Sequence, residues 1–282
     1  MVSQLNLLDY EAKIRFGIFF GILTIMTLWE IVAPCRRLST PKTMRWFSNV
    51  GLLVLGTAVL HTVFPMATVG VAAIANEHQW GMLQSLQIPY WQTVVFSIIL
   101  LDFTTYLQHT LFHALPALWR LHKVHHVDLD FDVTTGLRFH PLELLLSMVG
   151  KLAVVLLLGS PVIAVLLFEV ILNTTSMFNH GNVSLPDKLD RYLRWFVVTP
   201  DMHRIHHSTI TQETNSNYGF NLPWWDYILG TYCHRPSVSH TAMTIGLAEH
   251  QKDRRAERLS WMLVLPFLNH PASSKAGVSH HR

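Results

Sequence analysis

The amino-acid sequence predicts an all-α integral membrane protein with a histidine-rich helical cap, and three observations carry this prediction. Half of the 282 residues are apolar, whereas only 14% are charged, against about 25% in an average soluble domain. Four long stretches carry few charges and are long enough to enter or cross a ~30 Å hydrocarbon core as helices. Eighteen histidines accompany only two cysteines, so imidazole is the abundant metal ligand and a disulfide framework is excluded. The formal charge of +3 is scattered and indicates no nucleic-acid partner.

The first three apolar stretches are predicted to be single spans. Residues 14–33 and 50–75 each have about 20 residues or more, which is enough to cross the membrane. The first span continues into Pro34 and Cys35 with no small-residue cleavage site, so we expect it to remain in the mature protein. The third span begins near Trp91, becomes polar toward His109 and is expected to project beyond the membrane face.

Residues 142–178 predict a helical hairpin, because Gly159-Ser160-Pro161 interrupts an otherwise apolar stretch. Each arm has about 17 residues, the lower limit for crossing, so the hairpin either spans the bilayer or re-enters on one side. The chain therefore has about four to five membrane-embedded helices. Lys151 and Glu169 each lie nine residues from Ser160, and this equal distance predicts an ion pair between the arms.

The distribution of Lys and Arg predicts the orientation. Residues 36–45 carry four basic side chains and residues 76–91 carry none, so the first loop is expected in the cytoplasm, although Lys13 and Arg15 argue weakly against this. The protein is then multi-pass, in the inner membrane of a bacterium or the endoplasmic reticulum of a eukaryote. Among the cytosolic segments, residues 187–198 predict an interfacial helix, residues 246–268 a second helix, and residues 269–282 a disordered tail.

Ten histidines gather in five motifs that all fall at the same predicted membrane face. The motifs are HTLFH (His109, His113), HKVHH (His122, His125, His126), FHPLE (His140), NHGN (His180) and HRIHH (His203, His206, His207). Positions i, i+3 and i+4 of a helix share one face, so each HxxHH motif presents three imidazoles to one point. Ten imidazoles exceed the needs of one ion, which predicts two metal ions at the cytoplasmic face. Imidazole suits zinc, iron, copper and nickel, so ligand type leaves the metal open.

Several polar side chains close to these motifs are candidates for supporting roles. Asp102 and Tyr106 share a helical stripe with His109, and Asp102 is expected to orient an imidazole as a hydrogen-bond acceptor. Similar roles are predicted for a further set of side chains: Glu143 one turn after His140, and Asn179 and Asn182 beside His180. Asp226 is either a packing residue under the metal site or a member of it.

The order and content of these motifs resemble one family. DFTTYLQHTLFH, HKVHH, FHPLE, NHGN, TPDMHRIHH and NSNYGFNLPWWDYILGTY, over about residues 92–232, resemble the fatty acid hydroxylase/sterol desaturase superfamily. By position, the three histidine boxes of the family fall on the HTLFH, HKVHH and HRIHH motifs, while His180 and His140 match further family histidines. Thr110 stands where many members have arginine, and Ser176 stands where some branches have another histidine.

The resemblance implies a membrane-bound di-iron oxygenase that uses O2 to hydroxylate or desaturate a fatty acyl lipid, a sterol or a related lipid. Two iron ions are the expected cofactors, with zinc as a replacement in recombinant material. No electron-carrier domain is evident at either end, so a separate reductase with a ferredoxin or cytochrome-type carrier is expected. The predicted regions are N-terminal spans at 1–91, a catalytic domain at 92–235 and a C-terminal helix and tail at 236–282.

Two other classes of function remain open at this point. A dinuclear zinc hydrolase would need Glu143 or Asp226 as a general base near metal-bound water. A non-enzymatic metal-binding or transport protein would also use many histidines, but transport sites usually lie near the bilayer midplane, whereas these histidines gather at one face.

Overall fold

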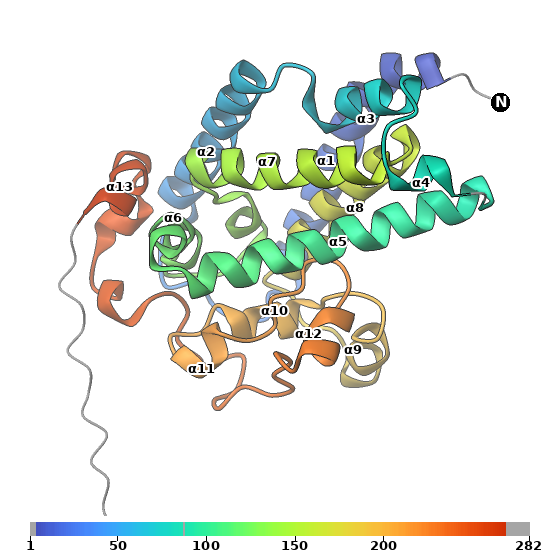
Figure 1. The fold of residues 1–282 in the computed structure, drawn as a ribbon. Helices are drawn as coiled ribbons and strands as arrows, with labels where there is room; N and C mark the ends of the chain where they lie inside the picture. The colour runs from blue at the N-terminus through green and yellow to red at the C-terminus, as the bar shows by residue number, and fades with distance from the viewer. Residues whose placement is uncertain (1–3, 87, 269–282) are drawn as a thin grey trace, which may run out of the picture.

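The protein is built from helices, as the composition predicts. The computed structural model describes residues 4–86 and 88–268, and within these ranges it contains helices and one isolated bridge between Ser208 and Ile245. Five stretches of this described part are long and apolar enough to cross a membrane: Tyr10–Val32, Lys42–Ser85, Tyr90–Ala114, Pro141–Leu158 and Val162–Asn179. In Figure 1 the long helices lie together, and the short helices α9 to α12 gather below α5 as a cap.

The second predicted span, residues 50–75, is wrong as a single helix. The structure has α2 (Lys42–Val63) and α3 (Ala67–Glu77) with a break between them, after the first span α1 (Gln4–Val32). Pro65 explains the break, because proline disfavours helical geometry in the residue before it, and Phe64 is extended at φ −125° and ψ 72°. The short helix α4 (Met82–Ser85) follows α3.

The third span and the hairpin agree with the sequence-based prediction. Helix α5 covers Tyr90–Ala114, and the hairpin consists of α7 (Pro141–Leu158) and α8 (Val162–Asn179). Gly159 ends α7 in the left-handed conformation at φ 65°, where a Cβ atom would meet the carbonyl oxygen of Trp80 at 2.1 Å. Glycine is therefore required both by the backbone conformation and by the close approach of the preceding loop.

The predicted ion pair across the hairpin is present, but it belongs to a larger cluster. Lys151 Nζ lies 3.7 Å from Glu169 Oε1, and Arg15 Nη1 of α1 lies 2.5 Å from Glu169 Oε2. Thr68 of α3 donates a hydrogen bond to the same carboxylate. Since Glu169 is only 4% exposed, the two cations and the hydroxyl group together satisfy a charge that would otherwise be buried and unpaired. Four helices thus meet at one carboxylate.

We expect Arg15→Met and Lys151→Met to be non-additive, because each single variant leaves Glu169 with one cation. The double variant strands the carboxylate, which costs about 3–5 kcal/mol, and this loss should exceed the sum of the single losses. The free energy of unfolding in detergent measures it. Adding Glu169→Gln to the double variant should restore part of the stability. A double variant that equals the sum of the singles would show that the two cations act independently.

The remaining helices form the cap and its attachments. They are α6 (Pro116–His126), η1 (Val133–Leu137), α9 (Asp187–Leu193), α10 (Pro200–His206), α11 (Thr211–Thr214), α12 (Trp224–Leu229), η2 (Ala248–His250), η3 (Arg254–Glu257), α13 (Leu259–Val264) and η4 (Leu265–Phe267). Residues 246–268 are therefore several short turns rather than the predicted single helix, and the predicted interfacial helix is shortened to α9. The predicted disordered tail, residues 269–282, lies outside the described residues.

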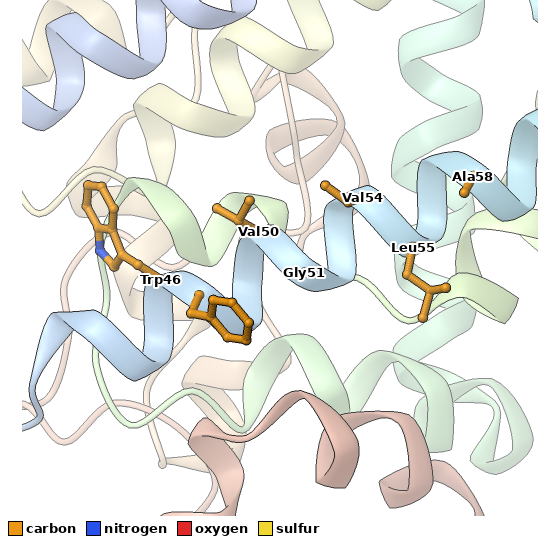
Figure 2. Close-up of a pocket in the computed structure, with 7 residues that line it drawn as sticks. Trp46, Val50, Gly51, Val54, Leu55 and Ala58 are labelled. Atoms are coloured by element: carbon orange, nitrogen blue, oxygen red, sulfur yellow. The ribbon is translucent and has the colours of Figure 1, made fainter.

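The C-terminal segment packs against the outer side of α2. Trp261, Met262 and Leu265 form a buried cluster with Leu52 of α2 and Val124 of α6. Beyond this contact an apolar groove runs along α2 (Figure 2), lined by Trp46, Phe47, Val50, Gly51, Val54, Leu55 and Ala58. This apolar surface is suited to lipid contact on a helix that spans a membrane.

Candidate metal centre

Nine of the ten predicted histidine ligands converge in two neighbouring clusters. The first cluster contains His109, His113, His122, His126 and His206, and the second contains His125, His180, His203 and His207. Within each cluster, one ring nitrogen from every histidine lies within 4.8 Å of the others. The sequence motifs therefore meet in space although they are spread over almost one hundred positions.

Helices α6 and α10 each serve both clusters because of helical geometry. On α6, His122 and His126 are four residues apart and share a face toward the first cluster, while His125 points to the second. On α10 the arrangement is reversed. His203 and the C-cap residue His207 face the second cluster, and His206 faces the first. An HxxHH motif thus divides its three imidazoles between two sites instead of offering them to one point.

Hydrogen bonds at Nδ1 fix the tautomer of four rings. The acceptors lie 2.6–2.7 Å away: Tyr218 O for His109, Glu143 Oε1 for His122, Ser176 O for His180 and Ser216 O for His206. A carbonyl or carboxylate oxygen only accepts, so each Nδ1 carries the proton. In a neutral ring, Nε2 then presents a lone pair, which is the form that binds a metal.

In the first cluster, two of these lone pairs face each other at a distance that suits a shared cation. Nε2 of His109 lies 3.1 Å from Nε2 of His122, although both rings are protonated at Nδ1. In the second cluster, Nε2 of His180 lies 3.0 Å from Nε2 of His203 and 3.1 Å from Nε2 of His125, so these three ring nitrogens also converge on one point. Two nitrogens bound about 2.1 Å from one ion, at right angles, lie about 3.0 Å apart. The donor set therefore fits a metal ion in each cluster.

Burial keeps the imidazoles neutral and thus able to bind metal. Burial lowers the pKa of His180 to about 4. It also lowers the pKa values of His125, His126, His203, His206 and His207, with neighbouring histidines adding to the effect. In the described part of the chain, both ring nitrogens of His207 and Nε2 of His206 are buried without a hydrogen-bond partner. Buried ring nitrogens in this state are typical of a site for an ion or an ordered water molecule.

Aromatic rings and one open edge surround the clusters. The ring of Phe139 stacks on His125 with centroids 4.6 Å apart, and Phe131 packs on His180. Eight of the nine histidines are buried, whereas His113 is half-buried and its Nδ1 lies 3.3 Å from Oδ1 of the exposed Asn215. The first cluster is therefore the more accessible of the two.

The structure separates His140 from the other predicted ligands. Its Nδ1 caps the first turn of α7 by accepting from Leu142 N, and its Nε2 lies 3.3 Å from the carbonyl oxygen of Leu263. The motif FHPLE instead reaches the metal centre through its neighbours, because Phe139 stacks on His125 and Glu143 holds His122. A helix start changes the direction of successive side chains, so adjacency in the motif does not place His140 in the site.

Of the other predicted supporting residues, only Glu143 makes a hydrogen bond to a histidine ring in the described part of the chain. Glu143 binds an imidazole, as predicted, but Asp102 accepts a hydrogen bond from Trp225 Nε1 at 2.7 Å and not from a histidine. Tyr106 pairs with Thr231, and Asn179 donates to the carbonyl oxygen of Phe220. Asp102, Tyr106 and Asn179 thus hold the segment that begins at Ser216. Two carbonyl oxygens of this segment, those of Ser216 and Tyr218, orient histidine rings. The side-chain oxygen of Asn182 accepts a hydrogen bond from Arg36 N, and its side-chain nitrogen donates to Arg36 O.

Asp226 supports the same segment from below. Its carboxylate accepts from the backbone N–H groups of Tyr218 and Gly219 at 2.8 Å and from the hydroxyl group of Thr231. Burial raises the pKa of Asp226. Because the carbonyl oxygen of Tyr218 accepts the hydrogen bond from His109 Nδ1, Asp226 positions a histidine through one peptide unit.

A buried charge network lies directly after the HKVHH motif and was not predicted from the sequence. Arg45 makes a bidentate pair with Asp128 at 2.8 and 2.9 Å and reaches Asp132 at 2.8 Å. The charges of Arg45 and Arg138 hold the pKa of Asp128 well below its usual range despite complete burial. The alternation of Asp128, Asp130 and Asp132 directly after HKVHH was the available signal. Backbone acceptors such as Ser216 O and Tyr218 O leave no such signal, because every residue has a carbonyl group.

The fold and these two clusters define a class of helical protein with candidate membrane spans and two groups of buried histidines that could hold metal ions. The family model described as "Fatty acid hydroxylase" matches residues 94–231, the segment that carries all nine converging histidines. The chain belongs to the fatty acid hydroxylase/sterol desaturase superfamily and is therefore a membrane-bound oxidoreductase.

Individual relatives extend this result. Ornithine lipid hydroxylase of Rhizobium tropici is 31% identical over 238 residues, which cover 81% of this chain and 70% of that protein. Alkylglycerol monooxygenase of Xenopus tropicalis is 27% identical over 232 residues, which cover 79% of this chain and 48% of that protein. The Homo sapiens alkylglycerol monooxygenase is 29% identical over 136 residues, which cover 46% of this chain and 28% of that protein. The chain thus spans about half or less of these two monooxygenases. No solved structure matches it significantly.

We expect Glu143→Gln to weaken metal binding by about 10–100-fold, the usual effect of removing a carboxylate partner from a metal-binding histidine. The amide keeps the size of the side chain but loses the charge that fixes His122 with Nδ1 protonated. Competition with a chelator measures the affinity. Glu257→Gln is the matched control, because this buried carboxylate pairs with Arg254 away from the clusters. Equal affinity in the two variants would contradict the role assigned to Glu143.

Proposed function

We propose that the protein is a di-iron monooxygenase that hydroxylates the apolar part of a membrane lipid. The overall reaction is R–H + O2 + 2e⁻ + 2H⁺ → R–OH + H2O, with the electrons supplied by a separate reductase and carrier protein. The observation that carries the proposal is the pair of neighbouring histidine clusters, in each of which the ring nitrogens converge on a point that could hold one cation. The names of the relatives, an ornithine lipid hydroxylase and alkylglycerol monooxygenases, favour hydroxylation over desaturation. They also favour a substrate of the ornithine lipid or alkylglycerol kind over a sterol.

The residues of the chain have distinct parts in this proposal. Five histidines would hold one iron and four the other, and the two irons together would supply the activation of dioxygen for attack on a C–H bond. Glu143 and the carbonyl oxygens of Tyr218, Ser176 and Ser216 keep the rings oriented. The rings of Phe139 and Phe131 limit the access of water to the second cluster. The half-buried His113 marks the side from which small molecules reach the first cluster.

The hydrolase alternative is less well supported, because both candidate bases are already engaged. Glu143 holds His122, and Asp226 accepts two backbone N–H groups and a hydroxyl group. The transport alternative is disfavoured by position, since the histidines gather at the last turns of α5 and α8 and not at the middle of the spans.

The test is the origin of the oxygen atom in the product. Iron-loaded protein in lipid nanodiscs is supplied with an electron donor and with either an ornithine lipid or an alkylglycerol lipid as candidate substrate. It should consume dioxygen only when one of these candidate substrates is present. Isotopically labelled O2 should then appear in a new hydroxyl group on the lipid. Label arriving only from water, with cleavage of an ester or ether bond and no dioxygen uptake, would replace the proposal by hydrolysis. Zinc-loaded protein is the matched control and should be inactive.

We further propose that the metal centre faces the cytoplasm. Ser39 and Thr40, in the arginine-containing loop, donate to Asp130 just after the HKVHH motif, so this loop lies on the side of the metal centre. Asn76, at the end of α3, donates to Ser160 O at the hairpin turn, so the loop that carries no Lys or Arg lies at the other end. The positive-inside rule then assigns the metal side to the cytoplasm.

Cysteine labelling of intact cells is expected to confirm this orientation. In a background with Cys35→Ser and Cys233→Ser, an impermeant thiol reagent should modify Glu77→Cys and leave Thr43→Cys unmodified until the membrane is permeabilised. Both positions are exposed, so the difference reports sidedness and not burial. The reverse pattern would place the metal centre outside the cytoplasm.

A further inference from the structure

The cap carries an exposed aromatic face that the metal centre does not use. It is formed by α9 with the turn that follows it and by α12, and its members are Leu189, Tyr192, Trp195, Phe196, Trp224, Ile228 and Leu229. Tyr192 and Ile228 are each 70% exposed and Phe196 is 68% exposed. A contiguous apolar patch of this kind is uncommon on a surface that faces only water, and it marks an interaction site.

The two segments of the aromatic face are fixed to one another. Trp224 Nε1 donates to the carbonyl oxygen of Trp195 at 2.7 Å, and Tyr227 donates through its hydroxyl group to the carbonyl oxygen of Arg194 at 3.0 Å. The rings of Trp195 and Tyr227 stack with centroids 5.5 Å apart. The face is therefore one preformed surface, although its parts are about thirty residues apart in the sequence.

Contacts with α5 and α8 place this surface beside the membrane spans and not beyond their ends. Trp225 of α12 contacts Phe103 of α5 at 4.6 Å between ring centroids. Phe103 precedes His113 by ten residues, which corresponds to about 15 Å along a helix axis. Asn221, just before α12, accepts a hydrogen bond from Thr175 inside α8. Helix α12 therefore lies at a level that the spanning helices occupy within or next to the bilayer.

The chemistry around the aromatic face matches a lipid surface. The exposed apolar side chains of α5, Phe96, Leu100 and Leu107, lie on the same helical stripe as Phe103 and continue the apolar surface from α12 onto the span. Lys188 and Arg191 are exposed on α9, where they suit anionic headgroups. Tryptophan and tyrosine are also the residues enriched where a protein meets the headgroup layer.

We propose that the aromatic face of α9 and α12 is embedded in the interfacial layer of the leaflet on the metal-centre side. Its apolar rings lie among the upper parts of the acyl chains, and Lys188 and Arg191 lie at the headgroups. This contact fixes the level of the cap relative to the lipid, so that the cap rests on the membrane instead of standing free in solution. The inference does not depend on the reaction that the metal centre catalyses.

The test is the depth of single spin labels in nanodiscs that contain phosphatidylcholine and phosphatidylglycerol. Labels at Phe196→Cys and Ile228→Cys, in the cysteine-free background, should collide more with oxygen than with a water-soluble nickel complex. Val149→Cys, 54% exposed on the spanning helix α7, is the lipid-facing control. Glu249→Cys, exposed on η2, is the aqueous control and should show the opposite ratio.

A second measurement uses a conservative substitution in case a label disturbs the cap. The wild type should lose more tryptophan fluorescence in nanodiscs with brominated acyl chains than Trp195→Phe does, because Trp195 is 60% exposed in the face. Labels at Phe196 and Ile228 that match the Glu249 control, with no difference in quenching at Trp195, would overturn the proposal. That result would assign the face to water or to a protein partner.

Discussion

Replacing His125 and His126 separately by alanine is expected to remove different metal ions. The wild-type protein should bind about two ions per chain, because five and four imidazoles converge on two points. His125→Ala takes a ligand from the four-histidine cluster, and His126→Ala takes one from the five-histidine cluster. Each variant should retain about one tightly bound ion and lose lipid oxidation to background, because the proposed chemistry uses both ions. Elemental analysis and the dioxygen-uptake assay measure the two effects.

The control for this pair is His140→Ala. His140 caps α7 and lies outside both clusters, so this variant should keep about two ions and measurable activity, with some loss of stability, about 0.5–2 kcal/mol, from the missing cap. If His125→Ala and His126→Ala both keep two ions, the clusters are not separate sites. If the wild type itself binds at most one ion, the dinuclear assignment is wrong.

Replacing Arg45 by methionine is expected to be among the most destabilising single changes outside the histidines. Arg45, Asp128 and Asp132 are all 0% exposed, so the variant leaves two carboxylates buried without their shared cation. Breaking such a network by removing one partner costs about 3–5 kcal/mol. Asp128 follows His126 by two residues, so metal binding should weaken together with stability. The unfolding midpoint in detergent and the metal content are the measurements.

Two further variants separate this effect from a general loss of charge. Arg255→Met breaks a pair with Asp253 in which the arginine side chain is 66% exposed, and it should leave the stability almost unchanged, because solvent screens an exposed pair. Adding Asp128→Asn to Arg45→Met removes one stranded charge and should recover part of the loss. An Arg45→Met protein as stable as Arg255→Met would show that the buried network contributes little.

Much of the fold was predictable because hydropathy and turn chemistry act locally. The stretches around α1, α5, α7 and α8 are long and apolar, and Gly159-Ser160-Pro161 marks the hairpin turn. The error in residues 50–75 came from counting apolar side chains across Pro65, whose effect on Phe64 is a backbone restriction that hydropathy does not register. Residues 246–268 were misread for a related reason, since their apolar side chains pack on α2 and α6 as short turns and not as one amphipathic helix.

The candidate site was predictable at the level of residue type and approximate place. Repeated HxxHH motifs at helical spacing, all at one membrane face, indicated nine histidines that the structure brings together. Their division between two clusters was not predictable, because it depends on how α6 and α10 are rotated about their axes relative to α5 and α8. The position of His140 was not predictable either, because α7 begins directly after it, so that His140 caps the helix while its neighbour Phe139 stacks on His125.

The sequence by itself determined that this chain has helices long and apolar enough to cross a membrane, that its candidate metal ligands are imidazoles, and that these imidazoles gather near one end of the long helices. Each of these follows from local composition and spacing, which helical geometry converts into position. Only the tertiary structure decided which nitrogen is free in four of the rings, since that depends on acceptors such as the carbonyl oxygen of Tyr218, which lies 109 positions from His109 in the sequence. It also decided that Glu169 serves two cations and that Arg45 serves two carboxylates. A buried charge must be paired, but which of the available partners reaches it is fixed by packing, because only a partner held in close, well-aligned contact offsets the cost of removing the charge from water.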